Sequence, residues 1–373
     1  MKIKNIKIIL EDKIIESGIE IKDGKIQKIG FVEDGIDYSN YYLAPGFIDQ
    51  HTHGAHGSDA MDGTIENLEE IAISLLKEGT TSFLATTMTM EEDKIKKAIQ
   101  AVNDYKSDRG ANILGVHFEG PFINKEKKGA QKEENIKVPS IDFIKRVNVG
   151  NQIKIVTIAP ETKGALEVIR YLKDNNIVAS IGHTAATANE VLEAIKAGAT
   201  QVTHAYNAMS PFTHRQIGVV GAMLLYDELK AELICDGIHV SKEAIQLLLK
   251  NKGISNIFLI TDAMRAKDID ETISELGGQA VYIKDNSARL EDGTLAGSIL
   301  KMIDGIKNII KFTNVSLVEA IRMASTNPAK NIGVYENKGS IAVNKDADLV
   351  ILDQNLKVVK TIVAGKVLFE NNN

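Results

Sequence analysis

The sequence has a single cysteine, Cys235, among its 373 residues. One thiol cannot form a disulfide within the chain, which fits a reducing compartment. Cys235 lies in an apolar run, and we interpret it as a core residue rather than a nucleophile. The N-terminal stretch lacks the apolar length and the small-residue cleavage site of a signal peptide. We therefore expect a cytoplasmic protein.

Other absences exclude further classes of function. No run approaches the ~20 consecutive apolar residues of a membrane-spanning helix. No GxGxxG or Walker loop follows the early apolar runs, so nothing indicates a nucleotide site. The net charge is −6 and no block of basic residues stands out, so we expect neither a nucleic-acid partner nor a membrane partner. A small-molecule substrate fits this composition better.

The two ends of the chain have the pattern of short β-strands. Residues 1–44 contain alternating apolar runs on either side of a Lys-Asp-Gly hairpin signal at Gly24, and residues 339–368 repeat the pattern. Chain termini often lie close together. We therefore predict a small β-sandwich domain made of residues 1–47 and 335–373.

The middle of the chain alternates short apolar runs with helical patterns. The runs are residues 43–53, 81–88, 112–120, 154–161, 177–184, 201–209, 231–240 and 256–264. Their near-continuous apolar character is typical of strands buried on both faces. The alternation over residues 48–334 predicts an α/β fold, a (β/α)8 TIM-type barrel, whose usual size is about 250 residues. A doubly wound open sheet is the structural alternative.

Several runs end in polar side chains that a buried strand does not need. These are His51, His53, His117, Glu119, His183, His204, Asn207, Asp236, His239 and Asp262. The carboxyl ends of barrel strands converge on one face, where active sites lie. Any one of these side chains can be a hydrogen-bonded core or capping residue. The whole set calls for a compensating cation, because buried charge is costly unless it is paired.

Nitrogen and oxygen donors without a thiolate suit Zn or Fe in a hydrolytic site. The number of donors suggests two divalent metal ions. The predicted ligands are His51, His53 and Asp262 for one ion, His183 and His204 for the other, and Glu119 between them. Such ions lower the pKa of a water molecule toward neutrality, and Asp262 would accept its proton. His117 stays outside the ligand set, as a neighbour that supports a ligand.

Seven segments together resemble the amidohydrolase superfamily. They are PGFIDQHTHG (45–54), HFEGPF (117–122), GHT (182–184), THAYNAM (203–209), DGIHV (236–240), TDAM (261–264) and DGTLAGS (292–298). The His-x-His motif is shared by many members, whereas HFEGPF and THAYNAM are typical of its phosphosugar deacetylases. The resemblance covers nearly the whole chain, including GSIAVNKDADLVILD near the C-terminus.

The resemblance implies hydrolysis of the acetamide of N-acetylglucosamine 6-phosphate to glucosamine 6-phosphate and acetate, in amino-sugar catabolism and cell-wall sugar recycling. Glu119, His183 and His204 would be the metal ligands shared across the family, and Asp262 the catalytic acid and base. Some members have Gln-x-Asn in place of His51 and His53 and bind one metal. The histidines of this chain therefore imply two. Glu119 takes the place of the carboxylated lysine of many amidohydrolases.

The resemblance also implies a set of substrate contacts. They are Ala130, Gln131, Asn207, Ala208, His214, Arg215, His239, Leu295, Ala296 and Gly297. Arg215, with His214, would bind the phosphate, since a planar guanidinium suits phosphate oxygens. This loop can serve the neighbouring subunit's site in the family, which implies a homodimer. Gln131 occupies a position where other members carry a histidine.

Two other functions compete with this one. The chain could be an amidohydrolase acting on a cyclic amide or a deaminase substrate, but no lysine stands at the predicted strand ends. It could also be a non-catalytic scaffold that kept the fold. The complete set of ligand positions argues against a scaffold.

Overall fold

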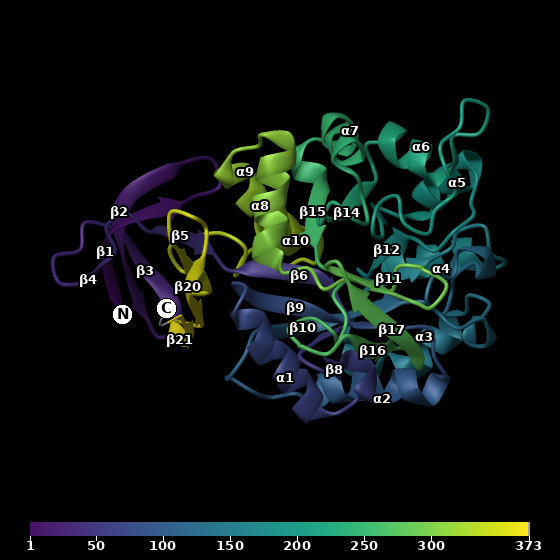
Figure 1. Ribbon diagram of the computed structural model, residues 1–373, viewed down its shortest axis with the longest axis horizontal. Helices are drawn as coiled ribbons and strands as arrows, with labels where there is room; N and C mark the ends of the chain where they lie inside the picture. The colour runs from purple at the N-terminus through teal and green to yellow at the C-terminus, as the bar shows by residue number, and fades with distance from the viewer. Residues whose placement is uncertain (372–373) are drawn as a thin grey trace.

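A parallel sheet of eight strands forms the centre of the protein, which is described here as a computed structural model of residues 1–371 (Figure 1). Its strands, in chain order, are β6 (Phe47–Thr52), β9 (Thr80–Thr87), β10 (Asn112–Glu119), β11 (Ile153–Ile158), β12 (Val178–Ile181), β13 (Gln201–Val202), β14 (Lys230–Ile234) and β15 (Ile257–Ile260). Each strand pairs in parallel with the next one along the chain. Five of them fall within the apolar runs that predicted them, and β9, β11 and β14 begin one residue earlier.

The sheet closes into a barrel between its first strand and the segment that follows its last. Thr52 forms a parallel bridge with Ala263. The Asp262 N–H donates to the His51 carbonyl at 2.8 Å, and the His53 N–H donates to the Ala263 carbonyl at 2.8 Å. The barrel prediction is confirmed, and the doubly wound open sheet is excluded by this closure.

Helices cover the outside of the barrel (Figure 1). They are α1 (Ile65–Leu76), α2 (Glu92–Asp104), α3 (Ile141–Val147), α4 (Ala165–Asp174), α5 (Ala188–Ala197), α6 (Gly218–Leu225), α7 (Lys242–Lys252), α8 (Met302–Thr313), α9 (Leu317–Ala324) and α10 (Thr326–Asn331). Short 3-10 turns are η1 (Ala60–Asp62), η2 (Lys125–Lys127), η3 (Glu133–Asn135), η4 (Val149–Asn151) and η5 (Ile254–Asn256). The apolar faces of the helices pack against the outward-facing side chains of the strands. Together they form one continuous core.

Both ends of the chain join a second sheet beside the barrel. Its strands are β1 (Lys2–Ile9), β2 (Ile14–Lys22), β3 (Lys25–Gly30), β4 (Ile36–Asp37), β5 (Tyr42–Pro45), β19 (Leu349–Leu352), β20 (Val358–Val363) and β21 (Lys366–Glu370). The predicted hairpin lies between β2 and β3, where Asp23 and Gly24 have φ of 51° and 75°, as a two-residue turn of this kind requires. The antiparallel pairing of β5 with β19 joins the two ends of the chain.

The strands of this terminal sheet form one continuous hydrogen-bonded sheet, which folds into two layers. A bridge between Lys25 and Asp346 ties the β3 edge to the segment before β19. The two layers enclose a core of their own, rich in isoleucine. The exact domain boundaries at residues 47/48 and 334/335 remain a prediction.

A single residue, Gly46, separates β5 of the terminal sheet from β6 of the barrel. A Cβ atom at this position would lie 2.1 Å from Thr81 Oγ1. The close approach of β9 therefore requires glycine here, and it fixes the direction in which β6 enters the barrel.

A three-stranded antiparallel insert follows β15 and was not predicted. It comprises β16 (Ile273–Leu276), β17 (Gln279–Lys284) and β18 (Ser287–Arg289). Leu276, Val281 and Ala288 of the insert pack with Met88 and Met264 at the carboxyl ends of the barrel strands. A shorter pair, β7 (Gly54–Ala55) and β8 (Ser58–Asp59), follows β6.

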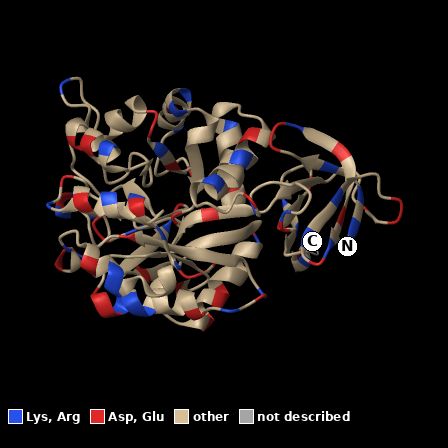
Figure 2. Cartoon of the chain, turned by 180° about the vertical axis from the view of Figure 1, so that it is seen from behind, with Lys and Arg blue, Asp and Glu red and all other residues tan. Residues whose placement is uncertain are grey.

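Two further properties concern the charges and the helices of the protein. Lysine, arginine, aspartate and glutamate are interspersed along the chain in the view of Figure 2. Among residues 1–371, no helix combines the length and the apolar character that a membrane span needs.

Candidate active site

A pocket of about 300 Å³ opens at the carboxyl ends of the barrel strands. It is lined by His53, Met88, Glu119, Glu126, Lys127, Gly129, Ala130, Gln131, His183, His204, Asn207, Ala208, His239, Asp262, Leu276, Thr294, Leu295 and Gly297. His51 lies directly beneath the lining and is fully buried. The strand ends therefore bring all six predicted metal ligands to one place.

Three of these residues, Glu119, His183 and His204, form what we call the loop cluster. Oε1 of Glu119 lies 3.1 Å from Nε2 of His183 and 3.1 Å from Nε2 of His204. The two Nε2 atoms lie 3.0 Å apart. Ligand atoms around a tetrahedral Zn²⁺ with bonds of about 2.0 Å are separated by about 3.3 Å. The three donor atoms are thus spaced as one face of a metal coordination sphere.

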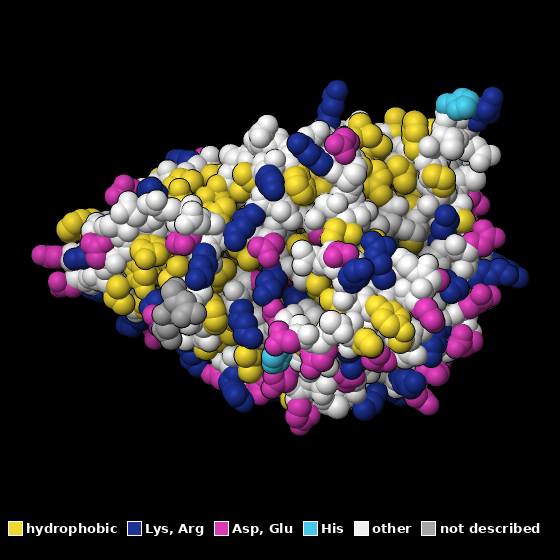
Figure 3. Space-filling model, in the orientation of Figure 1, with side chains coloured by type: hydrophobic (Ala, Val, Ile, Leu, Met, Phe, Trp, Pro, Cys, Tyr) yellow, Lys and Arg dark blue, Asp and Glu magenta, His cyan; other side chains and the backbone are white. Residues whose placement is uncertain are grey.

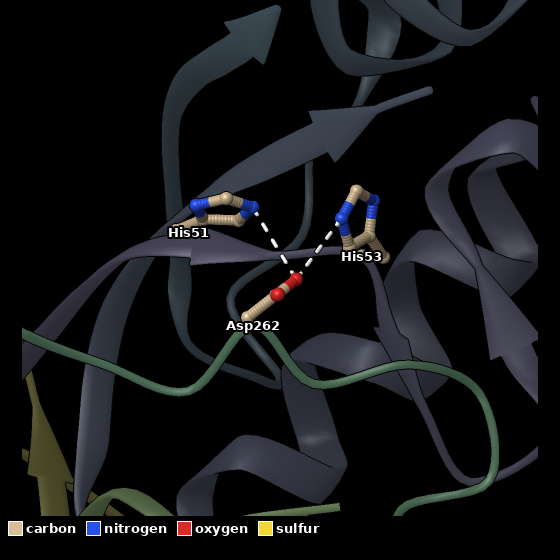
Figure 4. A group of neighbouring side chains, drawn as sticks. All are labelled: His51, His53 and Asp262. Carbon is tan, nitrogen blue, oxygen red and sulfur yellow. Dashed lines mark ion pairs between the residues drawn. The ribbon is translucent and has the colours of Figure 1, made fainter. Parts of the chain in front are cut away.

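His51, His53 and Asp262 form a second group, the strand cluster. Nε2 of His51 lies 3.4 Å from Asp262 Oδ1, and Nε2 of His53 lies 3.2 Å from the same oxygen. Figure 4 shows both rings turned toward this carboxylate. Oε2 of Glu119 is 3.2 Å from His53 Nε2. Oε2 of Glu119 therefore faces the strand cluster, while Oε1 contacts His183 and His204 and lies 3.6 Å from His51 Nε2.

Hydrogen bonds behind the rings fix which nitrogen faces the site. His51 Nδ1 donates to Glu232 Oε2 at 2.9 Å, and His183 Nδ1 donates to the Lys127 carbonyl at 2.7 Å. These acceptors keep the proton on Nδ1 and leave Nε2 as the metal-facing atom. His51 Nε2 is buried without a hydrogen-bond partner among the described residues. An orphaned buried nitrogen aimed at two carboxylates fits a bound cation.

The electrostatics of the buried groups show the same need for positive charge. Burial disfavours a charged His51, but the carboxylates of Asp262, Glu232 and Glu119 outweigh it and raise the pKa of His51 to about 9. Burial would raise the pKa of Glu119, but hydrogen bonds from His183 and His204 hold it well below the ordinary value. Without a metal, protons on His51, His53 and His204, whose pKa values are all raised, balance the carboxylates. A divalent ion would displace those protons on binding.

Local backbone geometry turns three of the ligands into the pocket. His183, His204 and Asp262 have φ of 47°, 30° and 49°, in the left-handed region that non-glycine residues seldom occupy. Each follows a barrel strand by two residues. The chain leaves the strand sharply at these points, which redirects the side chains from the wall toward the pocket.

His117 has a structural role instead. Its Nδ1 donates to the Gln50 carbonyl at 3.0 Å and its Nε2 is 2.8 Å from Thr157 Oγ1. Burial and the neighbouring His51 lower the pKa of His117 to about 4, so its ring is neutral. The ring packs against His51 with centroids 4.4 Å apart. His117 therefore supports a ligand and does not face the pocket.

The predicted substrate contacts lie in three places. The pocket is lined by Ala130, Gln131, Asn207, Ala208, His239, Leu295 and Gly297. Ala296 is fully buried under the insert and does not line the pocket. His214 and Arg215 lie on the exposed loop between β13 and α6, and Arg215 lines a separate cavity.

The sequence had not indicated several residues that shape the site. Leu276 and Thr294 of the insert region line the pocket. Asp236, which the sequence had placed at a strand end without a role, accepts from His239 Nδ1 at 2.6 Å and so orients this ring. Glu232 contacts both ligand clusters from below. A charged residue inside the apolar run AELIC was the available signal, because a buried carboxylate needs partners.

The model of the amidohydrolase family matches residues 42–368. The chain belongs to the amidohydrolase family. Membership in this family accounts for the barrel and for the second sheet beside it. It also accounts for the buried clusters of histidines and carboxylates, because the family is metal-dependent. This amidohydrolase is therefore an enzyme with residues suited to hold metal.

Among individual proteins, the chain is similar to deacetylases of N-acetylated sugar phosphates. This amidohydrolase is 43% identical to the N-acetylglucosamine-6-phosphate deacetylase of Bacillus subtilis (strain 168), over 98% of this chain and 96% of that one. It is 36% identical to an N-acetylgalactosamine-6-phosphate deacetylase of Escherichia coli O157:H7, over 87% of each. The crystal structure of N-acetylglucosamine-6-phosphate deacetylase from Thermotoga maritima superposes with a TM-score of 0.92 at 38% identity, over 100% of both chains.

Proposed function

We propose that the chain hydrolyses the acetamide of N-acetylglucosamine 6-phosphate to glucosamine 6-phosphate and acetate. The observation that carries this proposal is the convergence of Glu119, His183, His204 and Asp262 in one pocket. Relatives that share the whole length of this chain carry the same activity in their names. A single cysteine supports the cytoplasm as the compartment.

Two divalent ions per chain, Zn or Fe, fit the donors. The strand cluster would hold one, the loop cluster the other, and Glu119 would contact both. When bound, such ions lower the pKa of a water molecule and polarise a carbonyl oxygen. The donor set of imidazoles and carboxylates without sulfur suits both metals.

The chain's own residues would move the protons. Water adds to the acetyl carbon, the carbon–nitrogen bond breaks, and the amine leaves with a proton. Asp262 lies 8% exposed on the pocket wall, where it can take the proton from water and deliver it to the amine nitrogen. His239, held by Asp236, would contact the substrate, while Asn207 and Ala208 would line the sugar.

The phosphate contact would come from a second copy of the chain. In the described residues, the pocket lining includes a lysine, Lys127, but no arginine. The loop carrying Arg215 projects from the molecule beside α6, at the upper right of Figure 1. Phe212 and Leu225 nearby are 58% and 61% exposed, and hydrophobic side chains gather over this region in Figure 3. An exposed apolar face beside the loop supports a homodimer in which Arg215 serves the partner's pocket.

Acetate release from N-acetylglucosamine 6-phosphate tests the function directly. The unphosphorylated sugar, the galactosamine epimer and a dihydropyrimidine are the comparison substrates. We expect turnover of the first substrate and loss of turnover after treatment with a chelator, restored by Zn²⁺ or Fe²⁺. Preference for the galactosamine epimer would change the substrate, and turnover of the cyclic amide alone would overturn the proposal.

A further inference from the structure

We propose that Glu232 is a positioning residue that makes His51 a metal ligand and thereby sets the occupancy of the strand cluster. The inference rests on the proposed function. It concerns a carboxylate inside the barrel, beneath the pocket, that does not line it.

Glu232 forms a hydrogen bond with one residue of each cluster. Its Oε2 accepts from His51 Nδ1 at 2.9 Å and from the backbone N–H of His204 at 3.2 Å. It therefore contacts a side chain in the strand cluster but only the backbone of the loop cluster. A change in Glu232 should act on His51 more than on His204.

The other oxygen of Glu232 is held by two amides. Gln50 Nε2 donates to Oε1 at 2.9 Å and Gln201 Nε2 donates at 2.8 Å. Asn331 of α10 fixes the orientation of both amides, donating to Gln50 Oε1 at 3.1 Å and to Gln201 Oε1 at 2.7 Å. Glu232 thus accepts four hydrogen bonds, which suit an ionised carboxylate and leave it one orientation.

Glu232, His51 and His117 also lie close enough together to suggest a metal site of their own. Their hydrogen bonds argue against it. Both ring nitrogens of His117 are engaged, and Nδ1 of His51 is bonded to Glu232. The group is a hydrogen-bonded support, whereas the nitrogen left without a partner, His51 Nε2, faces the strand cluster.

Glu232→Gln is the informative substitution because it changes little besides the acceptor. If the new amide nitrogen faces His51, it donates to Nδ1 and shifts the ring proton to Nε2, which then cannot bind a cation. If the amide nitrogen faces Gln50 and Gln201, it meets donors that Asn331 holds in place. The second orientation keeps an oxygen toward His51 but opposes two donors, whereas the first opposes only the backbone N–H of His204. We therefore expect the first orientation, which disfavours His51 as a ligand.

The test measures metal rather than turnover. Wild-type protein and Glu232→Gln are loaded with Zn²⁺, and bound metal and dissociation constants are determined by elemental analysis and chelator competition. We expect two equivalents in wild type and about one in the variant, with affinity for the ion of the strand cluster lowered about 10–100-fold, as for other partners of metal-ligating histidines. Retention of both ions at wild-type affinity would overturn the inference, as would equal weakening of both.

A double-mutant cycle tests whether the effect passes through His51. In a His51→Gln background, Glu232→Gln should lower zinc binding no further. An additional loss would mean that Glu232 acts elsewhere. Glu78→Gln is the matched control: Glu78 is equally buried, pairs with Lys267 at 3.0 Å and lies outside the site. We expect that control to lose stability but keep both ions.

Two further measurements distinguish failure of this inference from failure of the proposed function and from misfolding of the variant. Metal content and acetate release of the wild type test the proposed function, so a wild type with two ions beside an unaffected Glu232→Gln sinks this inference alone. If Glu232→Gln does not fold, Asn331→Ala loosens the same support from outside. It should weaken the same ion by less than Glu232→Gln is predicted to, and unchanged zinc affinity would contradict the inference.

Discussion

The two ligand clusters are held in different ways. In the strand cluster, His51 belongs to β6 and is anchored by Glu232 within the barrel interior. In the loop cluster, His183 and His204 lie beyond the ends of β12 and β13, with left-handed backbone conformations. His51 is therefore held within the barrel core, whereas His183 and His204, like Asp262, depend on the segments beyond the strand ends.

Glu161 and its partners show what the loop cluster depends on. Glu161 accepts from the Thr184 hydroxyl at 2.6 Å, from the Ala185 N–H at 2.7 Å and from Asn124 Nδ2 at 2.9 Å. The Asn124 N–H in turn donates to the His183 carbonyl at 2.9 Å. One carboxylate thus joins the loops after β10, β11 and β12. The contrast is between a ligand supported by a closed barrel and a ligand supported by connected loops.

Asp262→Asn should have the largest effect on activity because Asp262 has two roles in this comparison. It is a ligand candidate of the strand cluster and the proposed proton carrier. We expect kcat to fall by about 10²–10⁴-fold, the range attributed to general acid–base catalysis. Steady-state acetate release measures it.

The loop cluster serves as the internal control for this variant. Glu119, His183 and His204 are unchanged, so at least one equivalent of metal and the folded circular dichroism spectrum should persist. A rate close to that of wild type would contradict the role given to Asp262.

The barrel was predictable because its strands are unusually apolar and because polar residues recur at their ends. Every residue of β15 is buried, as its sequence IFLI suggests. The geometry of the turns that follow the strands was harder to predict from the sequence. The run 201–209 gives a strand of only two residues, β13, since His204, Tyr206 and Ala208 adopt positive φ. Tertiary contacts, not local preference, hold these residues there.

The sequence contained a signal for the three-stranded insert, although the insert was not predicted. Gly277-Gly278 and Asp285-Asn286 occupy its two turns, and all four residues have positive φ, the pattern of tight hairpins. The strands between them are short and half-exposed, so no apolar run marked them. Glu232 was missed for the opposite reason. It lies inside an apolar run, and its partners His51, Gln50 and Gln201 are distant in sequence.

Changing His51 to Gln together with His53 to Asn should remove the strand cluster alone. We expect bound metal to fall from two equivalents toward one, since Glu119, His183 and His204 remain to hold an ion. Activity should fall by about 10–100-fold, less than in Asp262→Asn, because the loop cluster and the proton carrier are intact. Elemental analysis and acetate release measure the two effects. Loss of both ions would show that the clusters do not bind independently.

Glu161→Gln should give the smallest effect and the opposite selectivity. The amide keeps the size of the side chain but loses an acceptor for the loops that position His183. We expect metal affinity of the loop cluster to fall by about tenfold, the lower end for such supports, with the strand cluster unaffected. Glu190→Gln is the matched control, because Glu190 caps α5 through Thr187 in the same segment and touches no ligand. If Glu161→Gln instead weakens the strand cluster, the two clusters share one support and the contrast between barrel-held and loop-held ligands fails.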